Sequence, residues 1–201
     1  MKKQILVIHG GGSFVGIPRG RLVEELKARK VELNRLRRTH DWKATLQEKL
    51  GEGYDVLFPR MPNPDDPRFK EWRAWFDNIL SVLDRDLILV GHSLGGLFLL
   101  KYFSEQETAK HIAGLFAVAP PYVTLEEKWG NSGFSLPEDF SKLGQIRKVF
   151  LYASNDDTVV SYEDGERFAQ KIPHASYTLL ENRGHFADGN FPEIIDDMRG
   201  L

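Results

Sequence analysis

The chain lacks cysteine altogether, since none occurs among its 201 residues. Disulfide bonds, thiolate metal sites and cysteine nucleophiles are therefore excluded. A large net charge is also absent: the formal value is −2, which gives no general attraction to nucleic acid or to an anionic membrane. Long hydrophobic runs are missing too, and the apolar stretch 5–8 near the N-terminus is too short for a secretory signal. These absences predict a cytoplasmic protein that binds no nucleic acid and spans no membrane.

The order of short apolar runs and amphipathic stretches indicates the fold class. With 201 residues, of which 41% are hydrophobic, the chain suits a single globular domain over 1–201. Apolar runs alternate with helical patterns, which predicts a mostly parallel sheet of about six strands with helices on both faces, a three-layer α/β/α sandwich. We expect strands at 4–9, 54–58, 86–90, 112–118, 148–152 and 176–180, and helices at 42–50, 69–83, 95–104, 162–171 and 191–198.

Two segments do not fit this alternation. Segment 17–40 is rich in arginine and lysine and carries apolar residues at helical spacing, which predicts a charged helical insertion of one or two amphipathic helices. It can act as a lid, as a dimer arm, as a contact for an acidic partner, or simply pack as a solvated helix. Segment 120–143 is punctuated by proline and glycine, and its aromatic residues belong either to a substrate pocket or to the core. These are Tyr122, Trp129, Phe134 and Phe140.

The pentapeptide G-H-S-L-G at 91–95 lies between the expected strand at 86–90 and a helix. A G-x-S-x-G sequence in this context forms a sharp, strained strand-to-helix turn that exposes the serine hydroxyl. Gly91 and Gly95 flank the turn where the backbone leaves no room for side chains. The pattern predicts Ser93 as a nucleophile; the alternative is an ordinary turn in which Ser93 caps the helix.

A serine nucleophile needs a base and an acid that orients the base. Folds of this type present these groups in the chain order Ser, Asp or Glu, His. His185 follows the last expected strand directly after Gly184, and we interpret it as the base; otherwise it is a surface loop histidine. Asp156 and Asp157 both follow the fifth strand, so one can serve as the acid while the other caps the turn, unless both only form the turn.

Backbone amides can supply the donors that an oxyanion requires. One is the N–H of Leu94, directly after the nucleophile. The second is expected from the glycine-rich loop after the first strand, at Gly11 or Gly12. That loop resembles a phosphate-binding turn, but neither G-x-G-x-x-G followed by a helix nor G-x-x-x-x-G-K-[ST] occurs, which disfavours nucleotide binding.

With these residues assembled, the chain resembles the α/β-hydrolase superfamily, and within it the small serine hydrolases grouped with retinoblastoma-binding protein 9 and its bacterial relatives. The resemblance rests on His9-Gly10-Gly11, the stretch R-M-P-N-P at 60–64 with Trp72 beyond it, Gly91-His92-Ser93, Asp156-Asp157 and Gly184-His185-Phe186.

This resemblance implies a reduced hydrolase core without the first two strands of larger members, and hydrolysis of carboxylic esters without a cofactor. It also favours Asp157 as the acid, because the acid of the superfamily usually stands three residues before a Val-Pro pair. Here Val160 is in place, but Ser161 replaces the proline. Relatives have a shorter connection at 17–40.

The expected function is therefore hydrolysis of small-molecule carboxylic esters through an acyl-enzyme on Ser93. A thioesterase or a peptidase would use the same three residues. A binding module without activity on a hydrolase scaffold is a different class of function, since fold alone proves no activity. The intact set of Ser93, Asp157 and His185 favours an enzyme over such a module.

Overall fold

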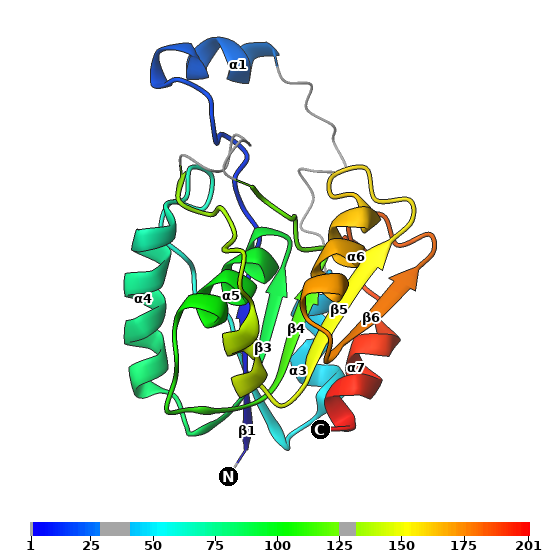
Figure 1. Ribbon diagram of the computed structural model, residues 1–201. Helices are drawn as coiled ribbons and strands as arrows, with labels where there is room; N and C mark the ends of the chain where they lie inside the picture. Colours follow the sequence, from blue (N-terminus) through cyan, green and yellow to red (C-terminus); the bar gives the residue numbers. More distant parts are fainter. Residues whose placement is uncertain (1, 29–40, 125–131) are drawn as a thin grey trace.

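The computed structural model describes residues 2–28, 41–124 and 132–201 and contains one parallel sheet of six strands in the order β2-β1-β3-β4-β5-β6 (Figure 1). The strands are β1 (Lys3–Ile8), β2 (Tyr54–Leu57), β3 (Asp86–His92), β4 (His111–Val118), β5 (Val149–Ser154) and β6 (Ala175–Leu180). The main helices are α3 (Trp42–Leu50), α4 (Phe69–Val82), α5 (Leu94–Glu105), α6 (Tyr162–Lys171) and α7 (Pro192–Arg199), with a 3-10 turn, η3 (Ser141–Gln145), before β5. The predicted six-stranded α/β fold is confirmed.

The helices form one layer on each side of the sheet. α4, α5 and α6 lie on one face, whereas α3 and α7 lie on the other (Figure 1). The chain winds from β1 toward β2 in one direction and from β3 toward β6 in the other, so the order reverses between β1 and β3. In open α/β sheets, ligands bind beyond the carboxyl ends of the strands at such a reversal. The loops that follow β1 and β3 are therefore the place to look for a site.

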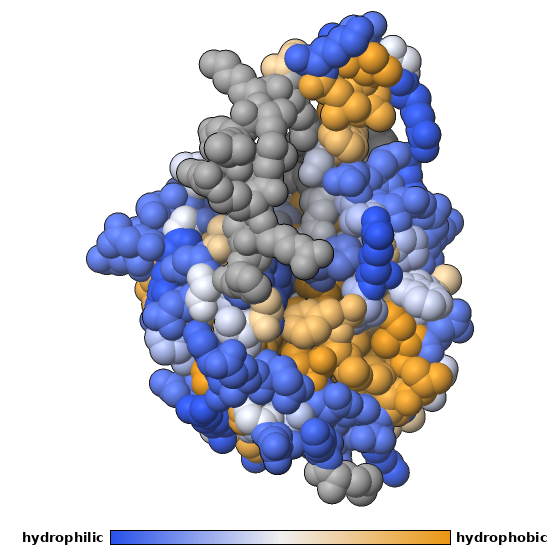
Figure 2. All heavy atoms as spheres, turned by 180° about the vertical axis from the view of Figure 1, so that it is seen from behind, coloured by the Kyte–Doolittle hydropathy of each residue, from blue (hydrophilic) through white to orange (hydrophobic). Residues whose placement is uncertain are grey.

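The segment at 17–40 differs from the other connections. Only its first part is described: a 3-10 turn, η1 (Arg19–Arg21), leads into the short helix α1 (Leu22–Ala28). No residue of α1 is buried, and Val23 and Leu26 are 60% and 46% exposed. Figure 2 shows hydrophobic surface at the top of the molecule, where Figure 1 places α1. A helix is thus present as predicted, whereas 29–40 lies outside the described residues.

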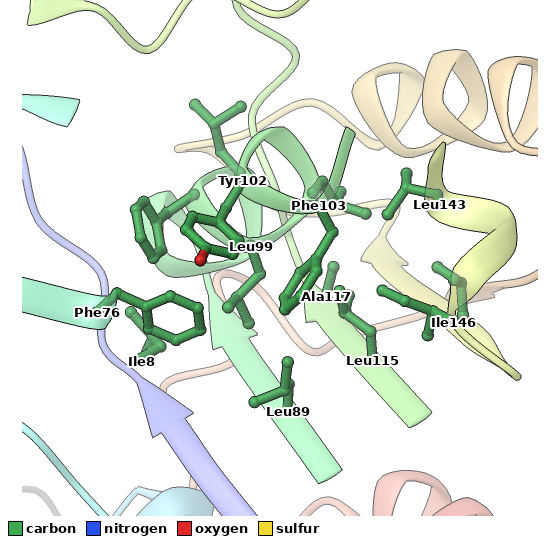
Figure 3. Packing of buried hydrophobic residues seen from close by; sticks show 14 of the residues in the cluster. Ile8, Phe76, Leu89, Leu99, Tyr102, Phe103, Leu115, Ala117, Leu143 and Ile146 are labelled. Carbon is green, nitrogen blue, oxygen red and sulfur yellow. The ribbon is translucent and has the colours of Figure 1, made fainter. Parts of the chain in front are cut away.

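Strand side chains alternate between two buried clusters, as a sheet covered on both faces requires. Leu87 and Leu89 of β3 point to the α4–α5 side, whereas Ile88 and Val90 point to the α3–α7 side. Figure 3 shows the first cluster, in which Phe76 of α4 and several α5 side chains pack on the strands. This packing fixes α5, and with it the preceding residue Ser93, against the centre of the sheet.

The remaining differences from the expected elements are small. β3 and β5 each run two residues further than predicted, to His92 and Ser154. In segment 120–143, Phe134 and Phe140 are buried in the core beside α4 and α6, as the core interpretation expects; Trp129 lies outside the described residues. None of the helices within the described ranges is long and apolar enough to cross a bilayer.

Candidate active site

Ser93 occupies a sharp turn between β3 and α5. Its backbone has φ 54° and ψ −122°, a region that costs a non-glycine residue about 1–3 kcal/mol. A Cβ on Gly91 would lie 2.4 Å from the Gly95 carbonyl oxygen, and a Cβ on Gly95 would lie 2.3 Å from that of Ile8. The Ser93 N–H donates to the Val118 carbonyl at 2.7 Å. The two glycines and this hydrogen bond hold the strained turn that the sequence predicts.

The first turn of α5 begins directly after Ser93. The Ser93 carbonyl accepts hydrogen bonds from the N–H groups of Gly96 and Leu97. The N–H of Leu94 has no acceptor within the described parts of the chain. It lies at a helix N-terminus, where unpaired amides carry partial positive charge. This amide is therefore available to an oxyanion formed at Ser93.

The glycine loop after β1 passes directly against Ser93. A Cβ on Gly10 would lie 3.2 Å from Ser93 Cβ and 3.7 Å from Ser93 Oγ. One of the two predicted donors in this loop is already engaged, because the Gly12 N–H donates to the Pro64 carbonyl at 2.6 Å. The Gly11 N–H has no acceptor among the residues described. The alternatives for the second oxyanion donor thus narrow to Gly11.

His9 joins this loop to the stretch around Met61. The Met61 N–H donates to His9 Nε2 at 2.9 Å, and Nδ1 lies 2.6 Å from the Gly10 carbonyl. Since an amide N–H can only donate, Nε2 accepts and Nδ1 carries the proton. Trp72 supports the same stretch by donating its indole N–H to the Pro62 carbonyl at 2.7 Å. Sequence reasoning identified these residues only as marks of resemblance, and their support of the glycine loop emerges from the structure.

Asp157 and His185 meet across the carboxyl ends of β5 and β6. His185 Nδ1 lies 2.7 Å from Asp157 Oδ2, and the Asp157 side chain is only 1% exposed. The other carboxylate oxygen, Oδ1, accepts the N–H groups of Val159 at 2.8 Å and Val160 at 3.1 Å. The carboxylate is thereby fixed as an acceptor. Since this carboxylate is an acceptor, Nδ1 of His185 carries the proton of the contact.

Asp156 has a different role. Its Oδ1 accepts from the Ser154 hydroxyl at 2.5 Å and from the N–H groups of Arg183 and Gly184 at 3.1 and 2.9 Å. The Ser154 hydrogen bond, and then that of Gly184, hold the pKa of this carboxyl below its usual value. Asp156 therefore anchors the loop that carries His185. Asp157 thus contacts the His185 ring, whereas Asp156 contacts the backbone of the loop before it.

The structure brings the Ser93 turn and the His185 loop together through His92. The rings of His92 and His185 lie 4.9 Å apart, and His92 Nε2 is 3.0 Å from the His185 carbonyl oxygen. No hydrogen bond to the Ser93 hydroxyl is present within 2–28, 41–124 and 132–201. Catalytic hydrogen bonds are often long without substrate and tighten on binding.

A cavity of about 800 Å³ adjoins the glycine loop on the side of Pro64. Its walls come from 14–19 and 60–71 with Leu22 and Ser132, and none of Ser93, Asp157 and His185 lines it. Gly12 and Phe14 donate to the carbonyls of Pro64 and Asp65, which connects the glycine loop to the wall of this cavity. We therefore locate the candidate chemistry at Ser93 and not in this cavity.

Comparisons with known proteins agree with this geometry. Residues 34–193 match the family model described as serine hydrolase. The putative hydrolase YdeN of Bacillus subtilis is 27% identical over 157 residues, which cover 75% of this chain and 80% of YdeN. The crystal structure of the ydeN gene product matches with a TM-score of 0.75 at 22% identity, over 99% of this chain and 98% of that one. Est1E from Butyrivibrio proteoclasticus matches with a TM-score of 0.64 at 16% identity, over 99% and 86% of the two chains.

These matches support a hydrolase, and the solved structures share its fold. The family model spans well over half of the chain. The resemblance drawn from the sequence is confirmed: the chain belongs to the serine hydrolase family, within the α/β-hydrolase superfamily.

Proposed function

We propose that the chain hydrolyses carboxylic esters of small molecules through an acyl-enzyme on Ser93. The observation that carries this proposal is the 2.7 Å contact between His185 Nδ1 and Asp157 Oδ2, held by loops next to the strained Ser93 turn. A carboxylate on Nδ1 leaves Nε2 as the basic nitrogen, which is the atom that a serine nucleophile needs as its base.

In the first step, Ser93 Oγ attacks the ester carbonyl while His185 Nε2 takes the hydroxyl proton. The tetrahedral intermediate then expels the alcohol, which receives that proton from the imidazolium. In the second step, water attacks the acyl-enzyme with His185 again acting as base, and the carboxylic acid and free Ser93 are released. Asp157 stabilises the imidazolium in both steps.

The charge on the intermediate is met by backbone amides. We assign the two donors to the N–H of Leu94, which directly follows Ser93, and to that of Gly11, which follows Gly10, the glycine that packs against Ser93. Neither N–H has an acceptor in the described chain. Such fixed donors stabilise the transition state without reorganisation, and each contributes about 10²–10³ in kcat.

The test is steady-state hydrolysis of an ester, a thioester and an anilide that carry the same butyryl group. An esterase gives the largest kcat/KM on the ester, and Ser93→Ala abolishes that activity while the thermal unfolding midpoint stays near that of the wild type. A thioester or anilide preference would support the thioesterase or peptidase alternative with the same residues. A folded wild type without activity on any of the three would favour the binding module.

A further inference from the structure

His92, the second residue of the pentapeptide, connects α3 to the loop that carries His185. Its Nε2 lies 3.0 Å from the His185 carbonyl oxygen, and its Nδ1 lies 3.4 Å from Lys43 Nζ. An ammonium group can only donate, so Nδ1 accepts from Lys43. The ring proton is therefore on Nε2, which donates to the His185 carbonyl. Lys43 thus selects the tautomer in which His92 can hold the backbone of His185.

The charges around His92 favour its neutral form. Burial lowers its pKa well below the usual value, and the proximity of Lys43 and then of His185 lowers it further; the hydrogen bond to the His185 carbonyl acts in the opposite direction. Lys43 is itself held by Asp41, with Nζ 2.6 Å from Oδ2. Asp41 also caps α3 by accepting the Ala44 N–H. The lysine is therefore fixed at the start of α3 and remains a donor.

Trp42 holds the next residues of the same loop. Its indole N–H donates to the Phe186 carbonyl at 3.1 Å, and its backbone N–H donates to the Asp188 carbonyl at 2.8 Å. Phe186 has a positive φ of 52°, so this loop is strained directly after His185. The carbonyls of His185 and Phe186 each accept one ring N–H, from His92 and Trp42. Together with the anchor at Asp156, these two contacts fix the position of the His185 backbone.

We propose that His92 and Lys43 are positioning residues for the His185 base, an inference that rests on the proposed role of His185. His92 immediately precedes Ser93, whose own N–H is fixed to Val118. The dipeptide His92-Ser93 therefore links the position of the Ser93 nucleophile to that of the His185 base. A neutral His92 is required for a second reason: a positive charge on it would oppose the imidazolium that forms 4.9 Å away on His185.

The experiment compares His92→Leu with His92→Gln, in which the side-chain amide can still donate to the His185 carbonyl and accept from Lys43. For a small ester, we expect His92→Leu to lower kcat by about 10-fold to 100-fold with little change in KM, because His92 contacts the base and no substrate. His92→Gln should restore most of kcat. Lys43→Met should cause a smaller loss of kcat, because it removes one of the two contacts that select the His92 tautomer but keeps the ring.

The matched control is Lys49→Met. Lys49 Nζ donates to the Gly189 carbonyl at 3.1 Å, in the same loop but four residues beyond His185, and its loss should leave kcat unchanged. If His92→Leu and His92→Gln lost kcat equally, and their thermal unfolding midpoints fell by a matching amount, His92 would contribute only through packing. That result would overturn the proposal. Unchanged kcat in His92→Leu would overturn it as well.

A readout independent of activity separates this inference from the proposed function. In ¹⁵N NMR spectra of the wild type with labelled histidine, His92, assigned by its absence from His92→Gln, should show a neutral ring protonated on Nε2. Lys43→Met should weaken this preference, because the His185 carbonyl alone then selects the tautomer. A wild-type ring protonated on Nδ1 would refute the positioning chain, even if the ester assay succeeds. If the wild type showed the expected tautomer but no turnover that depends on Ser93, only the proposed function would be refuted.

Discussion

Asp157 Oδ2 lies 2.7 Å from His185 Nδ1, whereas the neighbouring carboxylate of Asp156 accepts the N–H groups of Arg183 and Gly184 in the loop that precedes His185. Two adjacent aspartates thus support one histidine in different ways. The first contacts the ring, and the second anchors its loop.

Replacing Asp157 by asparagine tests the first role. The substituted side chain would present a neutral amide that cannot stabilise an imidazolium, and we expect kcat to fall by about 10³–10⁴. Asp156→Asn is the matched control, with the same chemical change one residue away and a much smaller loss of kcat. Kinetics of both variants on one ester measure the difference. The larger loss in Asp156→Asn would reverse our assignment.

Asp156→Asn should instead reduce stability in a pH-dependent manner. The pKa of Asp156 is lowered in the folded state, chiefly by the Ser154 hydroxyl and then by the Gly184 amide. The ionised carboxylate therefore contributes stability above the unfolded value of about 3.9, and this contribution is lost as the pH falls through the lower folded pKa. The unfolding midpoints of wild type and variant should differ near pH 7 and converge at strongly acidic pH. A constant difference across that range would contradict the assigned ionisation.

The lowered pKa of His92 predicts a second pH dependence of stability, in a higher pH range than that of Asp156. Burial keeps His92 neutral in the folded protein, and the proximity of Lys43 and then of His185 acts in the same direction. The unfolded chain binds a proton here below about pH 6.5, so stability is lost as the pH falls below that value. Between about pH 5 and 7, the free energy of unfolding measured by chemical denaturation should fall more steeply with decreasing pH in the wild type than in His92→Gln. Identical slopes would show that His92 is not the group responsible.

Gly11→Ala tests the glycine loop. The added Cβ would lie 2.2 Å from the Pro64 carbonyl oxygen, so the loop must move, and we expect the Gly11 N–H to leave the position of an oxyanion donor. We expect a loss of about 10²–10³ in kcat, the contribution of one oxyanion donor. Gly53→Ala is a suitable control, because no heavy atom lies within 4 Å of its added Cβ. Full activity in a folded Gly11→Ala protein would exclude Gly11 as a donor.

The features that are encoded locally could be predicted from the sequence. The Ser93 turn depends on residues two positions away, Gly91 and Gly95, and the sheet follows from apolar runs of the right length. The helix bounds of α3 and α6 were likewise predictable. These features need no knowledge of distant partners.

Features that depend on distant partners could not be predicted in the same way. Which of Asp156 and Asp157 faces His185 depends on how a turn presents two adjacent carboxylates to a loop 28 residues away. Gly12 is engaged by Pro64, and Lys43 reaches His92 across 49 positions. The spacing of Asp157 from Val160 favoured Asp157 only through the family resemblance, and no local pattern indicated the contacts of Gly12 and Lys43. The aromatic residues of 120–143 had two interpretations, and burial decided for the core at Phe134 and Phe140.

The most direct test of the central claim is the intact mass of the protein after reaction with a fluorophosphonate, for wild type and Ser93→Ala. An activated Ser93 predicts one covalent adduct on the wild type, located to the peptide that contains Ser93, and none on Ser93→Ala under the same conditions. An unmodified, folded wild type, or an adduct of equal yield on Ser93→Ala, would contradict the account of Ser93 as a nucleophile activated by His185 and Asp157.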